Sequence, residues 1–181
     1  MIYILSMKEL DKEKRKEAQR RLFSYAVFQK GWEQDGVSRV SYEELPLEDC
    51  GVKILRGEHG KPYVEDNPWY FNTSHSGEYL VIVFDTVPVG IDVQEERPVK
   101  KPELIAKRFS EEEREYALSG GPEAFYRVWC RKEAYAKCVG SGLSDEIFGK
   151  NLMGDVEGYE LTDVLCADGY KMCVCRAVCG C

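Results

Sequence analysis

Basic charge and long apolar runs are both scarce in this sequence. Its 181 residues hold 25 Lys and Arg against 32 Asp and Glu, a formal net charge of -7. A general nucleic-acid binder needs a basic face for phosphate contacts, so we expect no nucleic-acid partner, and any anionic ligand needs a local basic pocket. No apolar stretch is long enough to cross a bilayer, and the run in MIYILSMKEL reaches charge at Lys8, too early for a signal peptide. We therefore expect a cytoplasmic protein with no membrane partner.

Several familiar motifs are also missing. The chain has no Walker-type loop and no G-x-G-x-x-G, and its two histidines are His59 and His75. Eight cysteines are present, but a disulfide scaffold is typical of shorter chains with a signal peptide, so reduced thiols are expected. The tail CVCRAVCGC lacks the C-x-x-C spacing of a zinc knuckle, which favours a thiol-rich final strand over a metal site at Cys173, Cys175, Cys179 and Cys181.

What the sequence does contain is a core-forming composition, 44% hydrophobic, with strands and helices segregated along the chain. A strand at residues 1–5 and a helix at 8–30 precede a β-rich middle. Helices follow Pro98, among them one that a capping box of Ser110 and Glu113 opens, and a hairpin turning at Asp168-Gly169 closes the chain. Without strict βαβ alternation the pattern predicts an α+β fold. If there are two lobes, their junction falls between Asp85 and Gly90.

One predicted helix, FYRVWCRKEAYAKCVG at residues 125–140, carries charge where apolar residues are expected. Lys132 projects into the middle of its apolar stripe, and Glu133 lies one turn before Lys137. The ordinary interpretation is a lysine that snorkels past aromatic side chains, and an i,i+4 ion pair worth about 0.3–0.5 kcal/mol.

The segment VGIDVQ offers two oxygen-bearing side chains together. Strand alternation puts Asp92 and Gln94 on one face and Val93 on the other. A site with few protein oxygens, completed by phosphates and water, suits Mg²⁺. A solvated strand end explains the segment equally well.

The segments FNTSHSG and GKP contain groups that bind anions. The hydroxyl of Ser74, the imidazole of His75 and turn amides could converge on one anion, although such residues more often serve the turn itself. Lys61 and Arg20 have simple surface interpretations as well.

Taken in order, GKP, FNTSHSG, VGIDVQ, IAKRFSEEE and WCRKEAYAKCVGSGL resemble the 4′-phosphopantetheinyl transferases of the surfactin-synthetase-activating (Sfp) type. The resemblance spans roughly residues 60–143. It implies two similar α/β lobes in one monomeric chain, here an N-terminal lobe 1–86 and a C-terminal lobe 87–181 with the metal and catalytic helix residues. It also implies transfer of the phosphopantetheine group of coenzyme A to a serine of an acyl or peptidyl carrier protein, with release of adenosine 3′,5′-bisphosphate.

The resemblance also assigns residues. It implies Mg²⁺ on Asp92 and Glu133, with Gln94, directly or through water, in the place of an acidic ligand. Glu133 would help take the proton of the serine, and Lys137 would contact the pyrophosphate. The nucleotide end of coenzyme A, chiefly its 3′-phosphate, would be held by Arg20, Lys61, Pro62, Ser74 and His75.

Two further expectations concern the middle of the same helix and the segment at its end. Lys132 would reach through the lobe interface to a backbone or phosphate partner. A carrier protein would dock beside residues 138–150, with Phe148 and Lys150 as contacts. Two other functions stay open: a Mg²⁺-dependent nucleotide phosphohydrolase, and a non-catalytic protein that binds coenzyme A or a carrier.

Overall fold

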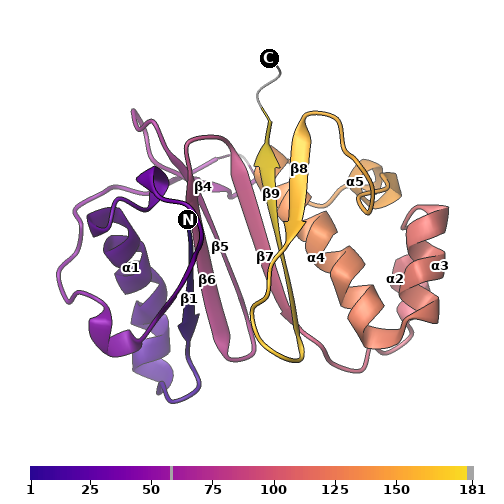
Figure 1. Cartoon of the computed structure of the whole chain (residues 1–181), viewed down its shortest axis with the longest axis horizontal. Helices are drawn as coiled ribbons and strands as arrows, with labels where there is room; N and C mark the ends of the chain where they lie inside the picture. The colour runs from indigo at the N-terminus through magenta and orange to yellow at the C-terminus, as the bar shows by residue number, and fades with distance from the viewer. Residues whose placement is uncertain (58, 179–181) are drawn as a thin grey trace.

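The computed structural model of the chain describes residues 1–57 and 59–178 (Figure 1). Two β-sheets lie side by side, and each has helices on its outer face. The first sheet has the strand order β2-β1-β6-β5 and the second β7-β9-β8. A small pair, β3-β4, lies in sequence between β2 and β5 of the first sheet. The predicted α+β fold is confirmed.

The first half of the chain builds the larger sheet around helix α1, which spans Lys12–Phe28. Asp11 caps this helix by accepting a hydrogen bond from the Lys14 amide at 2.9 Å. The helix is shorter than the predicted 8–30 because its cap lies at Asp11. The other elements are β1 (Ile2–Ser6), η1 (Gly31–Glu33), β2 (Val37–Val40), η2 (Tyr42–Glu44), β3 (Leu55–Arg56), β4 (Pro62–Tyr63), β5 (Tyr70–Ser76) and β6 (Tyr79–Asp85).

The second half of the chain, up to residue 178, places four helices beside the smaller sheet. Helix α3 begins with the predicted capping box, in which the Ser110 and Glu113 side chains each bond the other's backbone amide. Pro122 lies in the first turn of α4, where a proline's missing amide hydrogen breaks no hydrogen bond of the helix. The elements are β7 (Val89–Glu95), α2 (Pro102–Ala106), α3 (Glu111–Ser119), α4 (Gly121–Val139), α5 (Asp145–Gly149), β8 (Tyr159–Asp163) and β9 (Tyr170–Ala177).

Strand alternation gives each sheet two apolar faces and so produces four layers. In β1, Tyr3 and Leu5 pack in one core cluster with residues of α1, whereas Ile2 and Ile4 pack with residues of β7 and β9. A third cluster joins α4 to β9. The order of layers is therefore α1, first sheet, second sheet, α4, as Figure 1 shows.

The two sheets are joined between β5 and β7 by side chains. Alternate residues of β5, namely Asn72, Ser74 and Ser76, accept hydrogen bonds from backbone amides of Ile91, Val93 and Glu95 at 3.2, 3.3 and 3.0 Å. An edge strand needs partners for its amide groups, and these three oxygens supply them. The polar residues of FNTSHSG thus fix the register of β7 against β5.

Helix α4 packs directly against β7 because residue 90 is a glycine. A Cβ at Gly90 would overlap the carbonyl oxygen of Ala134 and the amide nitrogen of Cys138. Asp92 lies two positions after Gly90 and therefore on the same face of the strand. The close approach thus brings the C-terminal turns of α4 over Asp92, which is buried.

The expected division into lobes 1–86 and 87–181 stays a prediction, and the separation of the two sheets between β6 and β7 is compatible with it. Within the described residues, no helix combines the length and apolar character that a membrane span requires.

Candidate active site

Asp92 lies at the centre of a hydrogen-bonded cluster between the sheets. The residue as a whole is only 1% exposed. One carboxylate oxygen, Oδ1, accepts hydrogen bonds from the Lys137 ammonium and from the Ser74 hydroxyl, each at 2.7 Å. The other oxygen, Oδ2, accepts one from the Gln94 amide nitrogen at 3.0 Å. The prediction that Asp92 and Gln94 share a face of the strand is confirmed.

Lys137 forms its ion pair with Asp92 on β7 and not, among the described residues, with Glu133 along its own helix. Its ammonium group also donates to the Ile91 carbonyl at 3.1 Å and to the Ser74 hydroxyl at 3.2 Å. The ordinary interpretation of the spacing, an i,i+4 ion pair with Glu133, is therefore wrong, because β7 offers a buried carboxylate within reach.

Glu133 is half-buried on α4, facing the same space. Burial raises the pKa of its carboxyl group, the negative charge of Asp92 raises it further, and Lys137 opposes both effects. Two carboxylates that repel one another, with an amide beside them, form a set of hard oxygen donors. Such a set suits Mg²⁺, which takes few protein ligands and keeps water or phosphate oxygens for the rest.

Within the described residues, no three His, Cys, Asp or Glu side chains are grouped so that they could hold a metal ion by themselves. A cation on Asp92 and Glu133 would accordingly depend on Gln94, water or a bound phosphate to complete its coordination.

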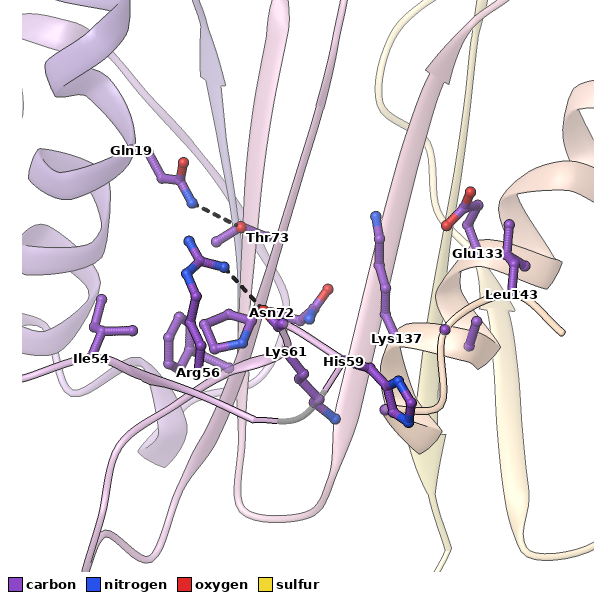
Figure 2. A pocket seen from close by; sticks show the side chains of 16 residues that line it. Gln19, Ile54, Arg56, His59, Lys61, Asn72, Thr73, Glu133, Lys137 and Leu143 are labelled. Atoms are coloured by element: carbon purple, nitrogen blue, oxygen red, sulfur yellow. Dashed lines mark hydrogen bonds between the residues drawn. The ribbon is translucent and has the colours of Figure 1, made fainter.

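A cavity of about 300 Å³ opens beside this cluster, between α1 and α4 (Figure 2). Glu133 and Lys137 line it from α4, Pro62 lines it from β4, and Lys61 lines it from the position just before β4. The Lys61 ammonium donates to the Cys138 carbonyl at 2.7 Å, and burial lowers the pKa of this lysine. Figure 2 also shows side chains that line the cavity from other parts of the chain, among them Gln19, Arg56 and His59.

A second cavity, of about 540 Å³, lies under α1 and is basic. Gln19 lines both cavities and donates to the Thr73 hydroxyl at 3.1 Å, so the two are neighbours. His75 faces the second cavity opposite three cations of one helix face, Lys12, Arg15 and Lys16. Cations on several side chains can bind a phosphate group there.

The structure corrects the expectation that Ser74 and His75 converge on one anion. Neighbouring residues of a strand point to opposite faces, so Ser74 turns toward Asp92 while His75 faces α1. Ser74 is 7% exposed and lines neither cavity. Arg20 also lines neither, since its guanidinium pairs with Asp49 at 2.9 Å.

Lys132 is buried among protein groups that bond its ammonium. It is 0% exposed, and its ammonium pairs with Glu113 on α3 at 2.6 Å and donates to the carbonyls of Ile147 and Lys150. The expected backbone partner is confirmed. The expected reach through the lobe interface is wrong, because α3, α4 and the segment around α5 all lie in the second half of the chain.

Phe148 is likewise misassigned as a docking contact. Its side chain is 2% exposed and packs with Phe109, Phe125 and Trp129. A ring enclosed in the core has no surface for a partner. Lys150 is exposed.

The thiols of the last strand are reduced and inside the protein, as far as the described residues show. Cys173 and Cys175 on β9 are free and buried, and burial raises the pKa of Cys173 to about 12. Cys179 and Cys181 lie outside the described residues.

Sequence reasoning missed Gln19 and the three cations of the second cavity. Their spacing was a usable signal, since Lys12, Arg15, Lys16 and Gln19 follow the i, i+3, i+4, i+7 pattern of one helix face. The pattern does not predict which part of the protein that helix face packs against. The loop that contains His59 has no periodic pattern, so it carries no such signal.

Comparison with known proteins supports one family. The family model of the 4′-phosphopantetheinyl transferase superfamily matches residues 88–166. The chain is 32% identical over 164 residues to 4′-phosphopantetheinyl transferase Sfp of Bacillus subtilis (strain 168), covering 78% of this chain and 70% of that protein. It is 41% identical over 107 residues to 4′-phosphopantetheinyl transferase psf-1 of Bacillus pumilus (55% of this chain, 44% of the relative). It is 36% identical over 111 residues to 4′-phosphopantetheinyl transferase HetI of Nostoc sp. (55% and 46%).

The extent of the first of these matches, together with the family model, shows that the chain belongs to the 4′-phosphopantetheinyl transferase superfamily. The matched segment 88–166 contains Asp92, Glu133 and Lys137, three of the residues that meet at the candidate site.

Proposed function

We propose that this chain transfers the 4′-phosphopantetheine group of coenzyme A to a serine of an acyl or peptidyl carrier protein. The observation that carries the proposal is the meeting of Asp92, Glu133 and Lys137 beside two adjoining cavities. A carboxylate pair and an ammonium group next to basic cavities suit phosphoryl transfer, which depends on positioning and charge neutralisation.

The donor would lie across both cavities. Lys137 would contact the pyrophosphate of coenzyme A, and Lys61 and Pro62 would line the nucleotide site in the first cavity. The 3′-phosphate would bind in the second cavity, between His75 and the cations Lys12, Arg15 and Lys16. Arg20, paired with Asp49, has no part in this arrangement.

Asp92 and Glu133 would hold a Mg²⁺ ion, with Gln94 beside them, directly or through water. Burial, and then the negative charge of Asp92, raise the pKa of Glu133. A divalent cation between the two carboxylates would remove the repulsion between them, which supports this assignment. When bound, Mg²⁺ supplies charge neutralisation for the pyrophosphate.

The protein's own residues account for the remaining steps. Glu133, directly or through water, accepts the proton of the serine hydroxyl. The serine oxygen then forms a bond to the phosphorus next to pantetheine, and the bond from that phosphorus to the bridging oxygen breaks. Adenosine 3′,5′-bisphosphate leaves with that oxygen, and Lys137 donates hydrogen bonds to the phosphate oxygens as charge develops on them.

Four further expectations, about lobes, docking, location and partners, belong to the same proposal. Residues 1–86 and 87–181 would act as two lobes of a monomer. The carrier would dock beside residues 138–150, where Lys150 is exposed. The protein would work in the cytoplasm, and neither nucleic acid nor membrane would be a partner.

One experiment separates this function from the alternatives. The protein is incubated with coenzyme A, Mg²⁺ and an apo carrier protein, and the carrier is then weighed by mass spectrometry. Gain of a phosphopantetheine group with release of adenosine 3′,5′-bisphosphate supports the proposal. Breakdown of coenzyme A without carrier modification indicates a phosphohydrolase, and binding without turnover indicates a non-catalytic protein.

A further inference from the structure

The three donors on Asp92 have a consequence for the order in which ligands bind. Oδ1 already accepts hydrogen bonds from Lys137 and Ser74, and Oδ2 accepts one from Gln94. Mg²⁺ binds carboxylate oxygens at about 2.0–2.1 Å, closer than any of these donors. A cation that approaches Oδ1 therefore competes with the two donors already bonded to that oxygen.

Lys137 is the donor that conflicts most with a cation. Its ammonium lies 2.7 Å from Oδ1, so a divalent ion on that carboxylate would be repelled by a like charge in contact with the same group. Ser74 and Gln94 are neutral, and Ser74 is held by its second bond to the Val93 amide.

Lys137 also has somewhere to go. Its side chain is 27% exposed, whereas that of Asp92 is 2% exposed, and it lines the first cavity together with Lys61. A phosphate group in that cavity offers the ammonium a charged acceptor that can replace its bonds to Asp92 and to the Ile91 carbonyl, because charge-assisted bonds to phosphate are strong.

We infer that Lys137 is a built-in counter-ion of Asp92 that must be drawn away by a phosphate group of the donor before Mg²⁺ binds well. This inference rests on the proposed function and deepens it. The phosphate donor and the metal then bind with positive coupling through Lys137, and by linkage each improves the affinity of the other by the same factor.

The test is a calorimetric titration with Mg²⁺ alone, in the absence of coenzyme A and carrier. Lys137→Met removes the ammonium but keeps the length of the side chain, and should bind Mg²⁺ about tenfold more tightly than the unchanged protein. Lys137→Arg keeps the charge and should bind no more tightly than the unchanged protein.

Lys61→Met is the matched control, because Lys61 lines the same cavity but bonds a backbone carbonyl. It should change Mg²⁺ affinity less than about threefold. Equal gains in the Lys61 and Lys137 variants would mean a general charge effect, and an unchanged or weaker affinity in Lys137→Met would overturn the inference outright.

A second measurement uses the unchanged protein and does not depend on a variant that folds. If Mg²⁺ displaces Lys137, saturating Mg²⁺ should speed its labelling by an amine-reactive reagent, read residue by residue by mass spectrometry. Unchanged labelling at saturating metal would also overturn the inference. Failure of the carrier-modification assay would instead count against the proposed function, since neither measurement uses a carrier.

Discussion

Helix α4 carries two lysines that meet carboxylates in opposite ways. Lys132 and Glu113 are both 0% exposed, and two backbone carbonyls complete the bonds of the ammonium. Lys137 is 27% exposed and reaches Asp92 at the wall of a cavity. The first pair holds α3, α4 and the segment around α5 together, whereas the second lies where a ligand can compete for either partner. The surroundings of an ion pair, and not its place along the helix, therefore decide whether a ligand can reach it.

The largest effect is expected at the cavity side of the helix. Glu133→Gln should lower carrier modification by about 10³–10⁴-fold, because both metal binding and proton removal depend on the carboxylate. Coenzyme A affinity, measured by calorimetry without carrier, should change little. Turnover within a few-fold of the unchanged protein would remove Glu133 from the mechanism.

On the structural side of the helix, Lys132→Met should lower the free energy of unfolding by about 3–5 kcal/mol, because it leaves the Glu113 charge buried without its partner. Urea unfolding followed by circular dichroism measures this loss. Lys137→Met should cost less than half as much, since Ser74 and Gln94 still bond Asp92.

A double replacement separates the cost of an unpaired buried charge from the cost of changed packing around α4. Lys132→Met with Glu113→Leu removes both charges and should recover most of the lost stability. If the double variant were no more stable than Lys132→Met alone, the cost would come from packing around α4 and not from an unpaired charge.

At the second cavity, His75→Ala should weaken coenzyme A binding by about tenfold, the value of one lost charge-assisted or polar contact. Dephospho-coenzyme A, which lacks the 3′-phosphate, should show a smaller defect. Arg20→Ala serves as control and should bind both donors normally, because Arg20 pairs with Asp49. Equal defects with both donors in His75→Ala would locate the histidine elsewhere.

A smaller effect is expected from the Glu133 carboxylate on the pH dependence of stability. Burial and Asp92 raise the pKa of Glu133 in the folded protein. A group with a raised folded pKa contributes stability below its unfolded pKa and loses it as pH rises through the folded value. Glu133→Gln should therefore raise the melting temperature near pH 7–8 without added Mg²⁺, by about 2–4 °C for each 1 kcal/mol. Below about pH 4 the variant should gain nothing.

The smallest effect is expected at Gln94. Gln94→Glu adds an anionic oxygen beside Asp92 and should lower the Mg²⁺ concentration for half-maximal transfer a few-fold. The rate at saturating metal should hardly change if water already completes the coordination. A shift toward higher Mg²⁺ would mean that residue 94 points away from the metal.

Sequence patterns predicted what depends on local geometry. The capping box at Ser110 and the shared face of Asp92 and Gln94 follow from helix and strand periodicity, and both are present. The same strand rule, applied to neighbours, would have separated Ser74 from His75, but the hypothesis of one converging anion site overrode it. The prediction that Phe148 contacts a carrier was wrong because an apolar residue near a loop can point into the core or out of it, and only the packing decides which.

By itself, the sequence determined the α+β class, the order of most elements and the family, because these depend on composition, periodicity and ordered motifs along one chain. The tertiary structure alone decided which lysine of α4 meets which acid, because Glu113 and Asp92 lie 19 and 45 positions away from their partners. It also decided that Gln19 joins two cavities and that the side chains of β5 bond the amides of β7. Charges separated in sequence become partners only when packing, as at Gly90, brings their backbones close enough for a bond of under 3 Å.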